Sequence, residues 1–269
     1  MRGARPCAPE GAHGQRACRR FPRVLGRLRV FVLCVLRPAP PPPAAPARSA
    51  RFLIAQGSLL AFVAGYIDVV GFSALFGLFT AHVTGNFVMI GVELAQSGQG
   101  VLAKLLALPV FVLAVASTKL AVAALARRGT APMRPLLLAQ AALLLAFMVA
   151  GLLALPIRSA DAPATILVGL IGVAAMGVQN AKARIVLSEH APTTIMTGNT
   201  TQIVIDVVEL LSPASTQKDI ARTRLRKMTP PLAGFAIGAV LGALAFAALS
   251  FWCVAPPVVI LLVLAALQR

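Results

Sequence analysis

Residues 80–93 read TAHVTGNFVMIGVE, and residues 194–206 read TIMTGNTTQIVID. The tripeptide Thr-Gly-Asn occurs in both stretches, although the whole chain contains only three asparagines. In each stretch an acidic residue follows the Asn by seven positions. Both stretches lie among long apolar runs, where a polar side chain without a hydrogen-bond partner is costly. This shared pattern, called the TGN motif below, therefore indicates two related structural features.

The composition is that of a membrane-embedded protein. Of the 269 residues, 58% are hydrophobic and 12% are charged, and the mean hydropathy is +0.85. A typical soluble domain is about 45–50% apolar and about 25% charged. A chain with so few polar side chains fits a lipid environment better than water.

Six apolar runs are long enough to cross a bilayer as helices, which takes about 20 residues and at least about 17. They cover residues 53–74, 105–126, 135–156, 164–181, 231–250 and 252–268. We expect Pro109 to open the second run and Pro230-Pro231 to open the fifth. The last run is marginal, because Pro256 and Pro257 would kink or shorten a helix there.

Residues 76–96 and 191–211 contain the TGN motifs and could either span the membrane or enter it part-way. If neither spans, the basic residues sort to one side. The tail, residues 127–134, residues 182–227 and Arg269 then hold 22 of the 25 Lys and Arg. Basic residues concentrate on the cytosolic side of membrane proteins. We therefore expect six spans with both termini in the cytosol.

The formal net charge of +17 is concentrated at the N-terminus, where residues 1–51 hold 11 arginines and a single acid. These residues lack a long apolar run, so we expect a disordered Arg/Pro-rich tail. Elsewhere the basic residues flank apolar runs, and the chain has only one Trp and one Tyr for stacking on bases. Nucleic acid is therefore not an expected partner. The four cysteines form no CxxC pair, and we expect no metal site and no cofactor.

The TGN motifs belong to a longer repeat. The sequence GYID begins 20 residues before the Gly of the first motif, and GVQN begins 21 residues before the Gly of the second. In each half one span precedes the TGN segment and two follow it, so repeat one is residues 52–156 and repeat two is residues 164–268 of a single transmembrane domain, 52–268. An odd number of spans turns the second copy upside down, as in inverted-repeat transporters. We expect an all-α membrane protein with about six transmembrane helices in two inverted three-span repeats.

Four segments, GYIDVVGF, FTAHVTGNFVMIG, GVQNAKAR and TTIMTGN, occur in this order along the chain. In these motifs the chain resembles the YoaK-type bacterial membrane proteins, a multi-pass family of unknown function. The resemblance covers about residues 53–268 and leaves the arginine-rich tail outside. It implies about six spans in a bacterial plasma (inner) membrane, and it implies no particular activity.

Each TGN motif is expected to start a half-helix or re-entrant segment. Helices over residues 87–96 and 200–211 would be about 15 and 18 Å long, about half of a 30 Å hydrocarbon core. The Gly permits a chain reversal, and the Asn can cap the exposed N–H groups of the helix that follows. The two helix N-termini would approach the membrane centre from opposite sides and favour anionic or carbonyl groups there. The alternative is that both segments are loops that pack the two halves together.

Asp68 is the main ionisable candidate, because it lies within the first apolar run. Its repeat partner Asn180 is neutral, and His82 has no ionisable counterpart, so Asp68 and His82 form a candidate proton relay. The Asn and the acid of each motif are about 700° apart on a helix and share a face. No catalytic residues are expected. The candidate substrate- or ion-binding residues are Asp68, His82, Thr84, Gly85, Asn86, Glu93, Gln179, Asn180, Thr197, Gly198, Asn199 and Asp206.

Gly234, Gly238 and Gly242 form a GxxxGxxxG pattern, which lets helix backbones approach closely. We expect these glycines to pack within the chain, while self-association to a homo-oligomer stays open. The basic run at residues 218–227 is expected to set orientation and to offer a contact for anionic lipid headgroups. We expect Lys119 to extend its ammonium group toward the membrane surface.

These features favour an ATP-independent permease or channel for a small solute or ion, with its site at the membrane midplane where the two TGN turns meet. The chain contains no GxxxxGK[ST], HExxH or GxSxG motif, and we do not expect an enzyme. The expected partners are the lipid bilayer and an unknown small solute or ion. The alternative is a non-transporting membrane interaction or scaffold protein that binds a partner or anionic lipid. A water-accessible centre at Asp68 would favour transport, and a dry centre would favour the alternative.

Overall fold

The computed structural model describes residues 50–187, 193–194 and 196–268. All regular secondary structure in this part of the chain is helical. The expected disordered tail lies outside the described residues, except for Ala50 and Arg51, which begin the first described helix. The structure thus shows an all-helical fold for the region that carries the apolar runs.

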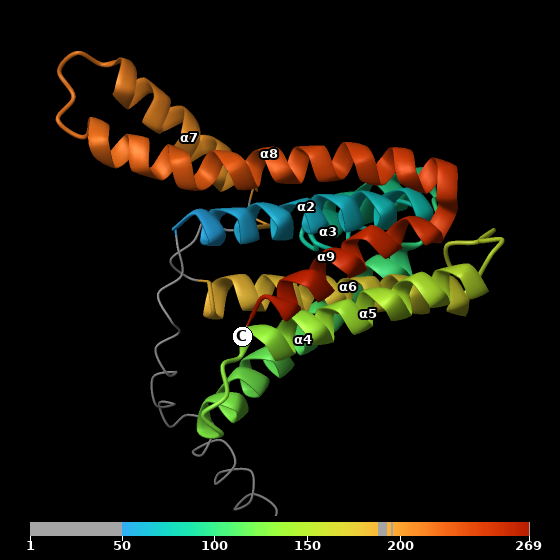
Figure 1. The fold of residues 1–269 in the computed structure, drawn as a ribbon. Helices are drawn as coiled ribbons and strands as arrows, with labels where there is room; N and C mark the ends of the chain where they lie inside the picture. The colour runs from blue at the N-terminus through green and yellow to red at the C-terminus, as the bar shows by residue number, and fades with distance from the viewer. Residues whose placement is uncertain (1–49, 188–192, 195, 269) are drawn as a thin grey trace, which may run out of the picture. The chain divides into compact units, whose positions relative to one another are not determined.

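The helices follow one another with short connections (Figure 1). They are α2 (Ala50–Ala74), α3 (Gly85–Gln96), α4 (Val101–Arg127), α5 (Met133–Leu153), α6 (Pro163–Ile185), α7 (Met196–Leu211), α8 (Lys218–Leu249), the 3-10 helix η1 (Ser250–Val254) and α9 (Ala255–Ala266). Five stretches of the described chain are long and apolar enough to cross a membrane. Four of them are α2, α4, α5 and α6, and the fifth, Lys218–Ala266, contains α8, η1 and α9.

The expectation that prolines open two of the apolar helices is wrong. Pro109 lies inside α4, which already begins at Val101, and Pro230 and Pro231 lie inside α8. Proline lacks the N–H that a helical hydrogen bond needs. Neighbouring helices and local adjustments compensate for that loss in membrane proteins, so a helix can continue through a proline.

Helices α2 and α8 pack with their backbones in close approach. A Cβ atom added to Gly234, Gly238 or Gly242 would lie 2.6, 2.2 and 2.7 Å from the carbonyl oxygens of Ser58, Phe62 and Tyr66, respectively. The contacts advance by four residues on both helices, so the two helices run in the same direction. The structure thus places the GxxxGxxxG glycines against a helix of the same chain.

Helices α4 and α6 make a similar contact. A Cβ atom added to Gly177 would lie 2.7 Å from the Cβ of Ala114 on α4 and 3.5 Å from the backbone oxygen of Phe111. Small residues at such positions let two helices approach closely. The pairs α2 with α8 and α4 with α6 are therefore both closely packed.

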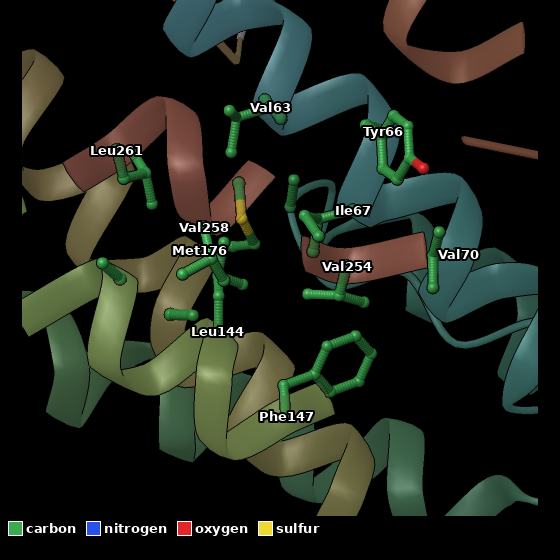
Figure 2. Packing of buried hydrophobic residues seen from close by; sticks show 14 of the residues in the cluster. Val63, Tyr66, Ile67, Val70, Leu144, Phe147, Met176, Val254, Val258 and Leu261 are labelled. Atoms are coloured by element: carbon green, nitrogen blue, oxygen red, sulfur yellow. The ribbon is translucent and has the colours of Figure 1, made fainter. Parts of the chain in front are cut away.

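The chain reverses after α8 at Ser250, which has a positive φ of 50°. In Figure 1, α9 then runs back along the bundle beside α5. Figure 2 shows the apolar core that results, with Ile67 from α2, Phe147 from α5, Met176 from α6 and Val258 from α9 facing one another. The short helices α3 and α7 contribute little to this core, so polar groups rather than apolar packing hold them in place.

Helix α8 extends beyond the start of α2. Figure 1 shows the first turns of α8 without a counterpart on α2. Figure 1 shows α7 folding back along these turns as a helical hairpin that projects from the bundle. We call residues 196–227 the α7–α8 hairpin.

Candidate functional site

The side chain of Asp68 holds the loop between α2 and α3. Asp68 is 4% exposed, and its Oδ1 accepts the backbone N–H groups of Thr80 at 2.8 Å and Ala81 at 2.6 Å. The hydroxyl of Thr80 is also within reach of the same oxygen, at 3.4 Å. The loop therefore folds back along α2, and backbone N–H groups satisfy the buried carboxylate of an otherwise apolar helix.

His82 completes the coordination of this carboxylate. Its Nδ1 lies 2.7 Å from Asp68 Oδ2, and its ring packs edge-on against Phe235 of α8 with centroids 5.3 Å apart. The imidazole also lies beside the backbone of Thr194, in the loop between α6 and α7. His82 is therefore positioned between the two loops that precede the short helices. Its side chain is 34% exposed, against 5% for that of Asp68.

Asn180 holds the second loop from α6. Its Oδ1 accepts the hydroxyl of Thr194 at 2.6 Å, and its Nδ2 donates to the carbonyl of Met176 at 3.0 Å. Asp68, His82, Thr194 and Asn180 are thus neighbouring polar residues, with one hydrogen-bonded pair in each half. We call these four residues the polar line.

The polar line lies in the middle of the bundle. Gln179, beside Asn180, donates from Nε2 to the carbonyl of Leu60 on α2 at 2.7 Å. Eight residues of α2 separate Leu60 from Asp68, which corresponds to about 12 Å at about 1.5 Å per residue. The polar line and Gln179 together therefore contact α2 between Leu60 and Asp68, within a helix of 25 residues.

The two TGN asparagines do not act as predicted helix caps. Asn86 lies inside α3, and its amide accepts the N–H of Phe79 at 2.8 Å and donates to the carbonyl of Phe79 at 2.9 Å. No side-chain hydrogen bond caps the start of α3. The reason is positional: the helix begins at Gly85, so Asn86 turns back to the preceding loop instead of capping the N–H groups ahead of it.

The second motif differs from the prediction in a related way. Helix α7 begins at Met196, so Asn199 lies within its first turn and does not start it. The Nδ2 of Asn199 is 3.9 Å from the sulfur of Met196. The neighbouring hydroxyls of Thr200 and Thr201 donate to carbonyls one turn earlier, at 2.9 Å each. The TGN motif thus lies at the start of α3 and inside the first turn of α7.

The acids of the two motifs each pair with a base on the helix that follows. Glu93 forms a direct ion pair with Lys104 of α4, whose Nζ also donates to the carbonyl of Phe76 at 2.8 Å. Lys104 is 2% exposed, so this ammonium group is buried and depends on both partners. The pair ties α3 and its loop to the first turns of α4.

Asp206 pairs with Arg224 of α8 through three contacts of 2.5 to 3.1 Å. Gln202 donates a further hydrogen bond to Asp206 at 3.0 Å. The hydrogen bond from the Arg224 guanidinium holds the pKa of Asp206 below its ordinary value. This pair ties α7 to the first turns of α8 and so closes the α7–α8 hairpin.

Asn and acid occupy the buried face of each short helix. The buried residues of α3 are Asn86 and Glu93, and those of α7 are Met196, Asn199 and Asp206. The remaining TGN positions face outward, because Thr84, Thr197 and Gly198 are exposed and Gly85 is half-buried. The structure therefore separates the predicted residues into the polar line, the two ion pairs and an exposed set.

A buried polar network was not anticipated from the sequence. Lys182 of α6 is fully buried and donates to Gln140 of α5 at 2.7 Å, and Gln140 donates to Gln179 at 2.6 Å. The spacing of Gln179 and Lys182, three residues apart on one helix face, was the available signal. In the sequence, Lys182 contributes only to the count of basic residues that sets the topology. Its partner Gln140 is distant in sequence.

Lys104, Arg224, Thr80 and Thr194 are further residues that the sequence reasoning missed. Each is the partner of a predicted residue, and each lies on a different segment from that residue. Among the described residues, no group of three or more His, Cys, Asp or Glu could hold a metal ion. The expectation that the protein uses no metal or cofactor stays a prediction.

The helical fold and its apolar stretches define a multi-pass membrane protein. Residues 56–267 match the family described as "Protein of unknown function (DUF1275)", so the chain belongs to this family. The chain is also 30% identical over 190 residues to the UPF0700 transmembrane protein YoaK of Bacillus subtilis (strain 168), covering 70% of this chain and 81% of that protein. No solved structure matches the chain. The resemblance to YoaK-type proteins is thereby confirmed.

Proposed function

We propose that this protein is an ATP-independent channel or carrier for a small solute or ion, and that its transport path passes the polar line. The observation that carries the proposal is the position of His82, which binds Asp68 and lies beside the loop that contains Thr194. This imidazole–carboxylate pair lies within an apolar helical bundle, and the His82 side chain is 34% exposed. Ionisable groups at this depth in a membrane protein are rare and usually functional.

The two halves support this proposal through matched contacts. Asp68 binds Thr80 and Ala81 in its own half, and Asn180, its repeat partner, binds Thr194, which occupies the position of Ala81 in the other half. Likewise each TGN acid pairs with a base on the next long helix. In each half the first long helix thus binds the loop before the TGN motif, which is compatible with two copies of one unit.

The helix pairs show the same correspondence. Gly65 and Gly177 are equivalent in the two repeats, and each packs against a helix that follows a TGN segment. Gly65 contacts Phe235 of α8, from the second half, while Gly177 contacts Ala114 of α4, from the first. This exchange of partners favours inverted repeats that meet at the polar line.

The proposed topology has six crossings, with α8 and α9 crossing separately after the reversal at Ser250. Helix α3 and the first turns of α7 are then re-entrant on opposite sides of the membrane, and the rest of α7 follows the first turns of α8 out of the hydrocarbon core. Non-helical backbone at membrane depth is tolerated only within protein or beside water. Both termini lie in the cytosol of a bacterium, because this arrangement keeps most basic residues inside.

The first half contributes a carboxylate and an imidazole to the polar line, whereas the second half contributes only neutral groups. This difference suggests a role for each residue. Asp68 is fixed by backbone N–H groups on one oxygen, so His82 is the movable partner on the other. Asn180 offers an amide where the first half offers a carboxylate. We propose that His82 exchanges a proton with Asp68 while the solute or ion passes, and that Thr194 and Asn180 provide neutral hydrogen-bonding groups.

The test is uptake into proteoliposomes that contain the purified protein. A library of small anions, cations and neutral solutes is screened with and without a pH gradient. We expect one solute class to accumulate in a protein-dependent manner, with at least a tenfold loss in His82→Gln and Asp68→Asn. Glu209→Gln, an acid outside the polar line, is the matched control and should retain uptake. Equal uptake by all three variants would contradict the role of the polar line.

A further inference from the structure

The α7–α8 hairpin places a basic helix segment at the level of lipid headgroups. Helix α8 has 32 residues, which corresponds to about 48 Å, whereas the hydrocarbon core is about 30 Å thick. The excess lies at the start of the helix, where α8 passes beyond α2 (Figure 1). The first turns of α8 must therefore lie in the interfacial region or beyond it.

The charges of this segment are largely free to meet an external partner. Lys218, Arg222 and Arg226 recur every four residues, so they share one face of the helix. Arg226 and Lys227 are exposed, and the Arg222 side chain is 61% exposed. The single acid among residues 218–227 is Asp219, which pairs with Arg222 at 3.2 Å. A net positive surface results.

Helix α7 adds an apolar surface beside these charges. Asp206 forms its ion pair with Arg224, which fixes α7 against α8. The Asp206 carboxylate therefore does not neutralise the exposed Arg222, Arg226 and Lys227. Val204, Val208 and Leu211 recur at helical spacing on α7 and are 57%, 60% and 76% exposed. Basic and apolar side chains together are typical of helices that lie at a membrane interface.

We propose that the α7–α8 hairpin binds the anionic headgroups of phospholipids in the adjacent leaflet. Arg222, Arg226 and Lys227 contact the phosphates, while Val204, on the bundle side of the Asp206–Arg224 pair, lies nearest the acyl chains. Charge complementarity favours phosphatidylglycerol-like lipids over zwitterionic ones. This inference depends on membrane insertion and is independent of whether the protein transports a solute.

The test compares the full chain in nanodiscs of phosphatidylcholine alone and with 30% phosphatidylglycerol. Thermal stability and the number of phosphatidylglycerol molecules retained, measured by native mass spectrometry, are the two readouts. We expect the anionic lipid to raise the melting temperature and to be retained on the protein. The triple substitution R222Q/R226Q/K227Q should at least halve both effects.

The control R127Q/R128Q/R134Q removes three exposed arginines near the α4–α5 connection and should keep most of the response. Asp219→Asn should increase retention of the anionic lipid, because it removes the one acid of the segment. If the triple variant does not fold, Asp219→Asn and the single Arg226→Gln still give opposite expected shifts. An unchanged response in the hairpin variants would overturn the proposal. A changed oligomeric state with an unchanged lipid response would overturn it too, and would assign the surface to contact with a second copy.

Discussion

Asp68 and Asn86 show how single polar residues shape a mostly apolar chain. Each uses its side chain to bind backbone groups of the loop between α2 and α3, so the loop has a fixed path without a large apolar core. Asp68 binds the N–H groups of Thr80 and Ala81, and Asn86 binds both polar groups of Phe79. A buried backbone group without a partner is costly, and so these residues determine the position of His82.

Replacing Asn86 with Leu should destabilise the protein. The substitution leaves the N–H and the carbonyl of Phe79 without their partner, and each unsatisfied buried group costs about 1–3 kcal/mol. Thermal unfolding in detergent should show a lower melting temperature for Asn86→Leu. The neighbouring Thr84→Val is the control, because Thr84 is exposed and should tolerate the change. Parent-like stability of Asn86→Leu would show that the loop does not need this side chain.

The Asp206–Arg224 pair should make the α7–α8 hairpin sensitive to acid. The hydrogen bond from Arg224 holds the pKa of Asp206 below its ordinary value. The pair therefore stabilises the fold above the unfolded-state pKa, about 3.9, and this contribution is lost as pH falls through the lower folded-state pKa. Asp206→Asn should be less stable than the parent at pH 6, and the difference should shrink at or below about pH 3. A difference that is the same at both pH values would contradict this origin.

At the scale of elements, close backbone packing determines how the long helices pair. The parallel contact of α2 with α8 rests on glycines that face carbonyl oxygens, and the contact of α4 with α6 rests on Gly177 and Ala114. A side chain at such a position would force the helices apart. The glycine spacing in the sequence suggests this packing, whereas the partner helix becomes clear only in the structure.

Gly238→Ala should weaken the pairing of α2 and α8. The added Cβ would lie 2.2 Å from the carbonyl oxygen of Phe62, and rigid backbone on both sides leaves little room to adjust. We expect a loss of stability of about 1–3 kcal/mol, as for other overpacked sites. Gly91→Ala is the matched control, since nothing lies within 4 Å of its added Cβ. Alanine there should be neutral or stabilising by about 0.5–1 kcal/mol. Equal effects of both substitutions on the melting temperature would contradict close packing at Gly238.

The sequence predicts a feature correctly where a single continuous segment contains all the residues that define it. The apolar runs predicted the long helices, and the depth of Asp68 singled it out as a polar group that needed partners. It failed where the signal is shared between distant segments, as for Lys104 with Glu93 and Gln140 with Lys182. The prediction that Pro109 and Pro230-Pro231 begin helices was wrong because an apolar helix can continue through a proline. Packing against neighbouring helices there outweighs the one lost hydrogen bond.

At the scale of the whole molecule, the central question is how the chain crosses the bilayer. The six-crossing proposal places the connection between α5 and α6 outside the cell and the turn between α7 and α8 in the cytosol. Cysteines introduced singly at Ser159 and Thr216, after replacement of the native cysteines, report these positions. An impermeant thiol reagent added to intact cells should label Ser159→Cys and spare Thr216→Cys. Labelling of the Thr216 variant from outside would contradict the six-crossing topology.

Water access to the polar line is the most direct test of the transport proposal. In the chain without native cysteines, His82→Cys places a thiol at the open position of the line. A small, charged methanethiosulfonate reagent should modify it in sealed vesicles, and a reaction within about 100-fold of the rate at Ser159→Cys is the predicted result, since a thiolate forms readily only where water reaches it. A thiol that stays unmodified while the Ser159 variant reacts fully would show a dry centre, contradict transport along the polar line and favour a non-transporting membrane protein.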